Sequence, residues 1–223
     1  MFNIPGVVLV MIALCAGVHL VRLYALSLDQ DLGLVSRAAF IPARYTGEYV
    51  IDIYAVTSTV TYAFLHGGWG HLIVNMVWLA AFGSPLANRL GAFRFAMFWL
   101  VTAWAAVALH YVLHSSEPVP LVGASGAISG MMGAAARFGF QIDRSSGRGR
   151  FSGQPLSVVQ TLTSRSVVVF LLVWMVVNFI SGMGYLTPED MGSIAWEAHV
   201  GGFLAGFLLI RLFGEELPGH AAL

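Results

Sequence analysis

The sequence has little charge, a single cysteine and no lysine. Only 10% of its 223 residues are charged and 58% are hydrophobic, against roughly 25% charged in an average soluble domain, so we expect an integral membrane protein. All 11 basic residues are arginine and 11 acidic residues balance them, which excludes a broad nucleic-acid-binding surface. The lone cysteine, Cys15, excludes an intrachain disulfide and a cysteine-based metal site.

Apolar segments of about the 17 to 25 residues that cross a bilayer recur along the chain. We predict six membrane-spanning helices, near residues 4–25, 71–88, 93–113, 123–139, 166–183 and 197–213. The fourth is short and rich in glycine and alanine, which suits a central helix packed among others. The predicted fold is an all-α polytopic membrane protein, in which residues 1–223 form one domain built as a six-helix bundle.

The arginines indicate how this bundle is oriented, because cytoplasmic flanks carry an excess of positive charge. Three arginines fall on one side of the predicted topology, and eight fall on the other: Arg89, Arg94, Arg137, Arg144, Arg148, Arg150, Arg165 and Arg211. Both termini are therefore predicted to be cytoplasmic. A long outer loop spans about 27–66 and is expected to be ordered, whereas a cytoplasmic loop spans about 140–165 and is expected to be flexible at 144–153. We expect a bacterial inner membrane, since no transit peptide or extra domain is evident.

A serine and a histidine lie at matching depths in the fourth and sixth predicted helices. Ser125 precedes Arg137 by 12 residues, and His199 precedes Arg211 by 12. At about 1.5 Å per residue, each lies roughly 18 Å from the inner boundary. A serine hydroxyl is a poor nucleophile until a base takes its proton. The pair therefore predicts a Ser–His dyad that hydrolyses peptide bonds within the membrane, and no carboxylate lies at a matching depth.

Two further polar residues reach the same layer from the second predicted helix. His71 and Asn75 are one turn apart on one face. With the backbone N–H of Ser125, they are candidate donors to the oxyanion that forms when a serine attacks a carbonyl. The alternative is that His71 and Asn75 form a hydrogen-bonded pair with a structural role.

Glycines accompany both halves of the predicted dyad. Gly123 and Gly126 flank Ser125, while Gly202 and Gly206 lie three and seven residues beyond His199. Small residues at these positions allow two helices to approach closely. Taken alone, such a run also fits helix packing without any catalytic role.

Two other histidines, His110 and His114, have the spacing of a metal-ligand pair on a helix. No His-Glu-x-x-His pattern and no second ligand pair accompanies them. We therefore interpret them as interfacial side chains, and predict neither a metal nor another cofactor.

At these residues the chain resembles the rhomboid family of intramembrane serine proteases. Gly123 to Gly126 match the family's Gly-x-Ser-Gly. His199 with its two following glycines matches His-x-x-Gly-x-x-x-Gly, and His71 with Asn75 matches His-x-x-x-Asn. The resemblance implies that Ser125 is the nucleophile, His199 the base, and the His71–Asn75 pair part of the oxyanion site. His66 matches a further histidine of the first outer loop.

The chain departs from the family pattern at three places. Thr57 and Ser58 stand where members often carry Trp-Arg, and Ala87 stands where they carry the glutamate of Glu-x-Arg. Ser129 stands where many members have an aromatic residue that packs on the catalytic histidine.

The leading functional hypothesis is an endopeptidase that cuts transmembrane or membrane-anchored proteins near the outer face of the lipid bilayer. One alternative is a catalytically silent rhomboid-like protein that binds membrane helices, and another is a channel or small-solute transporter. For the protease, we expect a lid at 181–197 and lateral access beside the fifth helix, gated by Phe170, Trp174 and Phe179.

Overall fold

Helices dominate the computed structural model, which describes residues 4–183, 185 and 195–214. Within these residues, five helical segments are long and apolar enough to cross a membrane: α1 (Gly6–Tyr24), Trp69–Leu90, α6 (Ala92–His114), α9 (Arg165–Gly182) and α10 (Trp196–Phe213). The second comprises α4 (Trp69–Trp78), a π-helical turn η3 (Leu79–Gly83) and α5 (Ser84–Leu90). The chain is an all-α, multi-pass integral membrane protein, as predicted.

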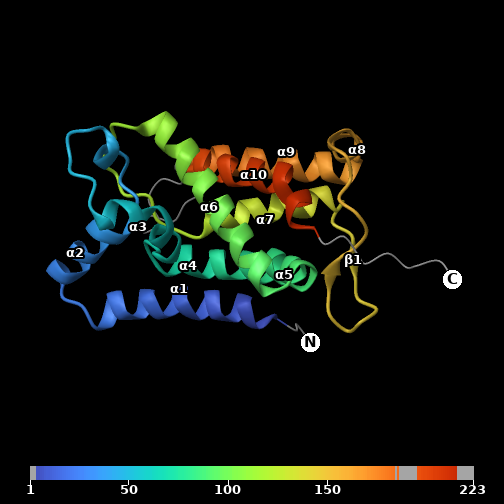
Figure 1. Cartoon of the computed structure of the whole chain (residues 1–223), viewed down its shortest axis with the longest axis horizontal. Helices are drawn as coiled ribbons and strands as arrows, with labels where there is room; N and C mark the ends of the chain where they lie inside the picture. The colour runs from blue at the N-terminus through green and yellow to red at the C-terminus, as the bar shows by residue number, and fades with distance from the viewer. Residues whose placement is uncertain (1–3, 184, 186–194, 215–223) are drawn as a thin grey trace.

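The remaining predicted span is a short helix inside the bundle. α7 (Ser125–Arg137) has 13 residues, and every residue from Gly126 to Arg137 is buried. It contacts α4, α6 and α10 and lies among them in Figure 1. At about 1.5 Å per residue it is roughly 20 Å long, less than the roughly 30 Å of a hydrocarbon core. The prediction of a central helix is confirmed, while the count of six spans stays a prediction.

Glycines let α7 and α10 touch backbone to backbone. A Cβ atom at Gly202 would overlap the carbonyl oxygen of Gly126, and one at Gly206 would overlap that of Gly130. Only glycine fits at these two positions without moving a helix. The contact therefore fixes the register of α10 against α7.

The long connection at 27–66 is ordered, as expected. It contains α2 (Leu28–Ala38), η1 (Pro42–Tyr45), α3 (Ile53–Thr61) and η2 (Tyr62–Phe64). Two side chains start its α-helices: Ser27 forms a capping box with Gln30, and the Asp52 carboxylate accepts from the N–H of Ala55 at 2.8 Å. The segment lies at the opposite end of the bundle from the hairpin and α8 (Figure 1).

Arg22 ties this segment to the end of α1. Its guanidinium donates to Asp31 at 2.7 Å and to the backbone carbonyl of His66 at 2.8 Å. Arg22 is one of the three arginines on the side with few positive charges. Its ion pair with Asp31 compensates the charge locally.

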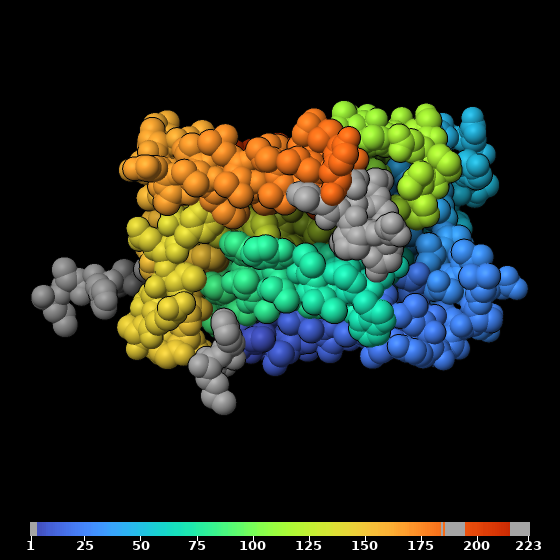
Figure 2. All heavy atoms as spheres, turned by 180° about the vertical axis from the view of Figure 1, so that it is seen from behind, coloured from blue at the N-terminus to red at the C-terminus, as the bar shows by residue number. Residues whose placement is uncertain are grey.

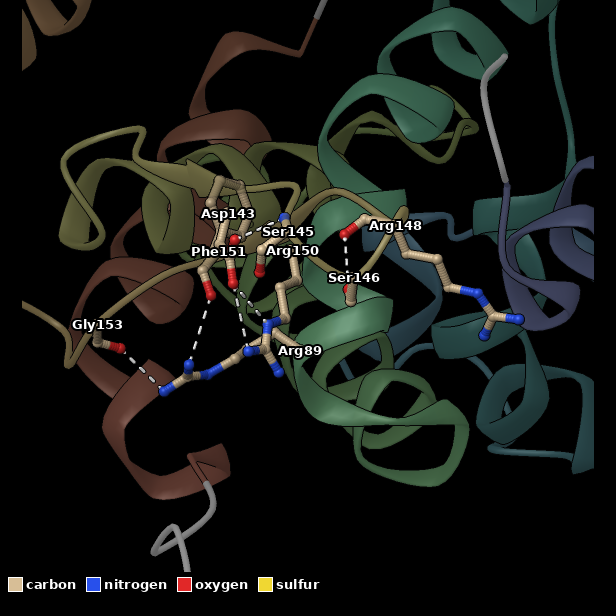
Figure 3. A network of polar contacts seen from close by, with 8 residues as sticks. All are labelled: Arg89, Asp143, Ser145, Ser146, Arg148, Arg150, Phe151 and Gly153. Carbon is tan, nitrogen blue, oxygen red and sulfur yellow. Dashed lines mark hydrogen bonds and ion pairs between the residues drawn. The ribbon is translucent and has the colours of Figure 1, made fainter.

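The connection at about 140–165 contains secondary structure where we expected a flexible loop. β1 (Ile142–Asp143) pairs antiparallel with β2 (Arg150–Phe151), and α8 (Val158–Thr163) follows. Figure 3 shows Arg89 of α5 reaching this hairpin, where it donates to the carbonyls of Phe151 at 3.4 Å and Gly153 at 2.9 Å. Asn88 donates to the carbonyl of Gly149 at 2.9 Å. These hydrogen bonds from α5 hold the hairpin in place. The Ser-, Gly- and Arg-rich composition of the segment does not predict them.

Candidate active site

Ser125 is the first residue of α7, in the position expected for it. Gly123 precedes it with a φ of +121°, a conformation that L side chains rarely adopt, and its N–H donates to the carbonyl of Tyr62 at 2.9 Å. This turn directs the chain into α7 at Ser125. The first N–H groups of a helix have no partner within it, so the first turn of α7 offers donors and the positive end of the helix dipole beside the hydroxyl.

The imidazole of His71 of α4 lies close to Gly123. A Cβ atom at Gly123 would lie 2.7 Å from Nε2 of His71 and 3.6 Å from Oγ of Ser125. The imidazole and the hydroxyl therefore border the same small space, which glycine leaves open. The N–H of Gly67 donates to Nδ1 of His71 at 3.4 Å. That bond makes Nδ1 an acceptor and places the ring proton on Nε2, the nitrogen that borders the space at Gly123.

Asn75 is buried one turn further along α4. Its side-chain nitrogen donates to the backbone carbonyl of His71 at 2.8 Å. This bond uses one of its two amide protons. Asn75 thus has a structural contact within α4 and retains a second donor.

His199 stands in the first turn of α10, where its imidazole meets α9. Nδ1 of His199 lies 2.5 Å from Oδ1 of Asn178. The amide nitrogen of Asn178 donates to the carbonyl of Trp174 at 2.7 Å. Because this second bond fixes which end of the amide faces His199, the oxygen must accept from the ring. The network assigns the proton to Nδ1 and leaves the lone pair on Nε2.

The first turns of α7 and α10 face each other. A Cβ atom at Gly126 would lie 3.8 Å from the carbonyl oxygen of Ala198, the residue before His199. Gly202, one turn beyond His199, packs on Gly126. Ser125 and His199 therefore begin two neighbouring helices at the same level, and Asn178 lies behind His199 on α9.

Asn178 is a candidate site residue that belongs to none of the sequence motifs. The sequence does contain a hint of its role, because Asn178 is a lone amide within an otherwise apolar segment. Polar groups inside a membrane usually face the interior of the helix bundle. Asn178 is buried, whereas most of α9 is not. Ser129, at the position where many rhomboid-like sequences place an aromatic residue, is buried within α7.

His66 lies next to His71 but shows no hydrogen bond from its ring in the described part of the chain. The two rings are 5.1 Å apart and nearly perpendicular. Burial, with a further contribution from the nearby His71, lowers the pKa of His66 to about 3. His66 is therefore neutral at physiological pH and adds no positive charge beside the site.

One face of the bundle is open between α4 and α9. Figure 2 shows a hollow between these two helices, with atoms in the colour of α7 at its floor. Both helices also carry exposed apolar side chains, among them Ile73 and Val77 on α4 and Met175 on α9. The floor of the hollow is thus the helix that carries Ser125.

The three predicted gate aromatics of α9 have different neighbours. The ring of Phe170 lies 6.4 Å from that of Phe82 in η3. The ring of Trp174 lies 4.6 Å from that of Phe203, and Phe179 contacts Trp196, so both pack on α10. Phe170 is the one in contact with the second span. The predicted lid at 181–197 falls mainly on residues 184 and 186–194, outside the described residues.

A model of the rhomboid domain matches residues 55–216, most of the chain. The chain belongs to the rhomboid family. The match runs from Ala55 within α3 through α10 and so contains every candidate site residue named above.

Individual relatives are more distant. The chain is 32% identical to RHOMBOID-like protein 7 of Arabidopsis thaliana over 67% of its length, and 30% identical to RHOMBOID-like protein 4 of the same plant over 65%. It is 28% identical to the rhomboid protease GlpG of Serratia proteamaculans over 67%. The matched segments cover 40%, 31% and 45% of those three proteins, less than half of each.

At the positions where this rhomboid departs from the family pattern, the residues that are present make contacts of their own. In the first loop, Ser58 is buried and bonds the hydroxyl of Tyr45 at 3.0 Å, while that hydroxyl donates to the carbonyl of Ala55 at 2.5 Å. At the end of the second span, Ala87 is buried and Arg89 holds the hairpin. At His199, where many members have a packed aromatic residue, Nδ1 of the ring instead has the side-chain oxygen of Asn178 as its hydrogen-bond partner.

Proposed function

We propose that this rhomboid is a serine endopeptidase that cleaves transmembrane or membrane-anchored proteins near the outer face of the bilayer. Ser125 is the nucleophile and His199 is the base. The observation that supports this most directly is the 2.5 Å contact between Nδ1 of His199 and Oδ1 of Asn178. It leaves Nε2 as the basic nitrogen, on a helix whose first turn faces that of Ser125.

In the proposed reaction, Nε2 of His199 takes the proton of Ser125 as Oγ attacks the scissile carbonyl carbon. The imidazolium then returns this proton to the leaving amine, and water hydrolyses the acyl-enzyme by the same steps. Such acid–base help typically contributes about 10²- to 10⁴-fold. Asn178 holds the ring and its tautomer during these chemical steps, as a neutral third member beside the dyad.

The oxyanion has three candidate donors, two of them beside the space at Gly123. The backbone N–H of Ser125 begins α7, and Nε2–H of His71 borders the same space. Asn75 retains one amide proton after its bond to the carbonyl of His71. Removing one donor of this kind typically costs about 10²- to 10³-fold in rate.

The hollow between α4 and α9 supports lateral access for a substrate helix (Figure 2). A membrane segment that leans against the exposed apolar rims would reach α7 without crossing the lipid headgroups. The rings of Phe170 on α9 and Phe82 on η3 lie 6.4 Å apart. Because Phe170 is in the first half of α9, toward the proposed inner side, a substrate would enter nearer to Ser125. The scissile segment must unwind there to present an extended peptide bond.

We further propose that both ends of the described chain face the cytoplasm. The start of α1 and the end of α10 lie at the same end of the bundle as the hairpin and α8 (Figure 1). That end carries eight of the 11 arginines. Location in a bacterial inner membrane stays a prediction, since relatives occur in a plant and in a bacterium.

Labelling with a fluorophosphonate, read by mass spectrometry, tests the proposal. We expect one labelled site, Ser125, and cleavage of a single-span reporter that is lost in Ser125→Ala and His199→Ala. The double variant should be no worse than either single one, because the two residues act as a unit. Ser129→Ala, one turn further along α7, is the matched control and should retain labelling. A folded wild-type protein that neither labels nor cleaves would instead be the silent helix-binding relative.

A further inference from the structure

A second cluster of reactive side chains lies where α6 ends and α10 begins. His110 and His114 are one turn apart near the end of α6, and Glu197 is in the first turn of α10. One coordinating atom from each of the three lies within 4.8 Å of the others. The proposed reaction uses none of them. The two histidines are neighbours because they are four residues apart on one helix. The carboxylate of Glu197 joins them only because α10 packs beside α6.

Two of the three distances between ligand atoms are close to those of a coordination shell, and the third is within 4.8 Å. Oε1 of Glu197 lies 2.7 Å from Nδ1 of His110 and 3.3 Å from Nε2 of His114. Around a tetrahedral Zn²⁺ with bonds of about 2.0–2.1 Å, ligand atoms are about 3.3 Å apart. The His114–Glu197 pair already has this separation, and the His110–Glu197 pair needs to open only by a few tenths of an ångström.

Glu117 orients one of the histidines from behind. Its Oε1 lies 2.8 Å from Nδ1 of His114. Histidines that bind metals commonly donate their other ring N–H to a carboxylate, which fixes the ring and its tautomer. Here the bond leaves Nε2 of His114 as the acceptor nitrogen, and it is this nitrogen that faces Glu197.

Burial separates the inner and outer parts of the cluster. The side chains of His110 and Glu197 are 10% and 6% exposed, while that of His114 is 31% exposed. A buried carboxylate is costly unless a cation or several hydrogen bonds compensate it. The exposed edge of His114 leaves a route for an ion and for a water as fourth ligand.

We propose that His110, His114 and Glu197 bind a divalent transition-metal ion of the zinc class. Two imidazoles and one carboxylate favour Zn²⁺ over Ca²⁺ or Mg²⁺, which prefer oxygen ligands. The ion links the last turn of α6 to the first turn of α10. Because His199 follows Glu197 by two residues on α10, the ion also fixes the turn that carries the proposed base.

Zinc titration of the metal-stripped, full-length protein in detergent micelles tests this site, with a chromophoric chelator as competitor. We expect one equivalent to bind, and His110→Ala, His114→Ala and Glu197→Gln to weaken binding by tenfold or more. Glu117→Gln should weaken it by about 10- to 100-fold, as expected for an outer partner. Glu48→Gln, an exposed glutamate of the first loop, is the matched control and should bind like the wild type.

X-ray absorption at the zinc edge is measured on the unmutated protein, so its result does not depend on whether the variants fold. The unmutated protein should show nitrogen and oxygen ligands at about 2.0–2.1 Å, two of them imidazoles, and no sulfur. Absence of saturable binding, affinity unchanged in all three ligand variants, or a shell without two imidazoles would each overturn the proposal. Neither measurement depends on proteolysis, so failure of the metal site and failure of the proposed protease are separate results.

Discussion

α7 and α9 both border the candidate active site, but they are packed in opposite ways. α7 is buried from Gly126 to Arg137 and touches α10 through glycine backbones. α9 buries only Val167, Asn178 and Ser181. The most buried helix thus carries the proposed nucleophile, while a loosely packed helix carries the partner of the proposed base. We infer that this contrast separates a fixed half of the site from a half that opens to substrate.

The contrast has a mechanistic consequence. If α9 moves outward to admit a substrate helix, the bond between Asn178 and His199 is strained or broken during admission and re-forms when α9 returns. The lone pair of His199 would then be aligned before admission, lost while α9 is displaced, and aligned again once α9 has returned.

The largest expected effect follows from adding one methyl group between α7 and α10. In Gly202→Ala the new Cβ overlaps the carbonyl oxygen of Gly126, so the helices must separate. We expect a destabilisation of about 1–3 kcal/mol or more and loss of cleavage, measured by thermal unfolding in detergent and a reporter assay.

The matched control for this change is Gly17→Ala in the middle of α1. A Cβ atom there meets no other atom within 4 Å, and alanine is the better helix former. This variant should be as stable as the wild type or slightly more stable. Equal behaviour of the two alanine variants would contradict a fixed α7–α10 contact.

The next effect concerns the oxyanion donors on α4, which forms the other rim of the hollow. Asn75→Ala and His71→Ala should each lower kcat by about 10- to 10³-fold without abolishing cleavage, because the N–H of Ser125 remains. Asn88→Ala, at the other end of the same span, is the control and should retain full turnover. A fully active Asn75→Ala with a lower Tm would show that Asn75 is structural.

Sequence patterns predicted the fixed half of the molecule well. The glycine-rich run at 123–133 has few interpretations inside a membrane, because small residues without polar side chains mean close packing. Five of the predicted spans agree with helices long enough to cross a bilayer, and Ser125 begins α7 as expected. Sequence motifs predict the α7–α10 contact because it is made by backbone atoms of glycines at a fixed spacing.

The mobile half and the cluster around Glu197 were harder to predict. Asn178 and Glu197 belong to no spacing pattern, and each acquires its partner only when a distant helix packs beside it. His110 and His114 were interpreted as interfacial because their third neighbour lies 83 residues beyond His114. The hairpin at 142–151 was missed for a similar reason, since Arg89 and Asn88 of α5 hold it in place.

A moderate effect is expected from Asn178→Ala. Losing one hydrogen bond of about 1 kcal/mol frees the ring of His199 to rotate and to change tautomer, so kcat should fall roughly tenfold with KM unchanged. Asn178→Asp, which keeps an oxygen acceptor at the same place, should restore most of the turnover. A change in Tm alone, or the same loss in both variants, would indicate that Asn178 only supports the packing of α9.

The smallest effect is expected at the inner end of the hollow, where Phe170 of α9 meets Phe82. Phe170→Ala removes that contact and should let α9 move outward more readily. If opening limits turnover, cleavage of a transmembrane reporter should rise roughly two- to fivefold. A short soluble peptide does not need the helices to part, so its cleavage should not change. Phe93→Ala on α6, where the side chain is exposed, is the control. Equal acceleration of both substrates would place the effect of Phe170 on the dyad, and a slower transmembrane reaction would argue against access between α4 and α9.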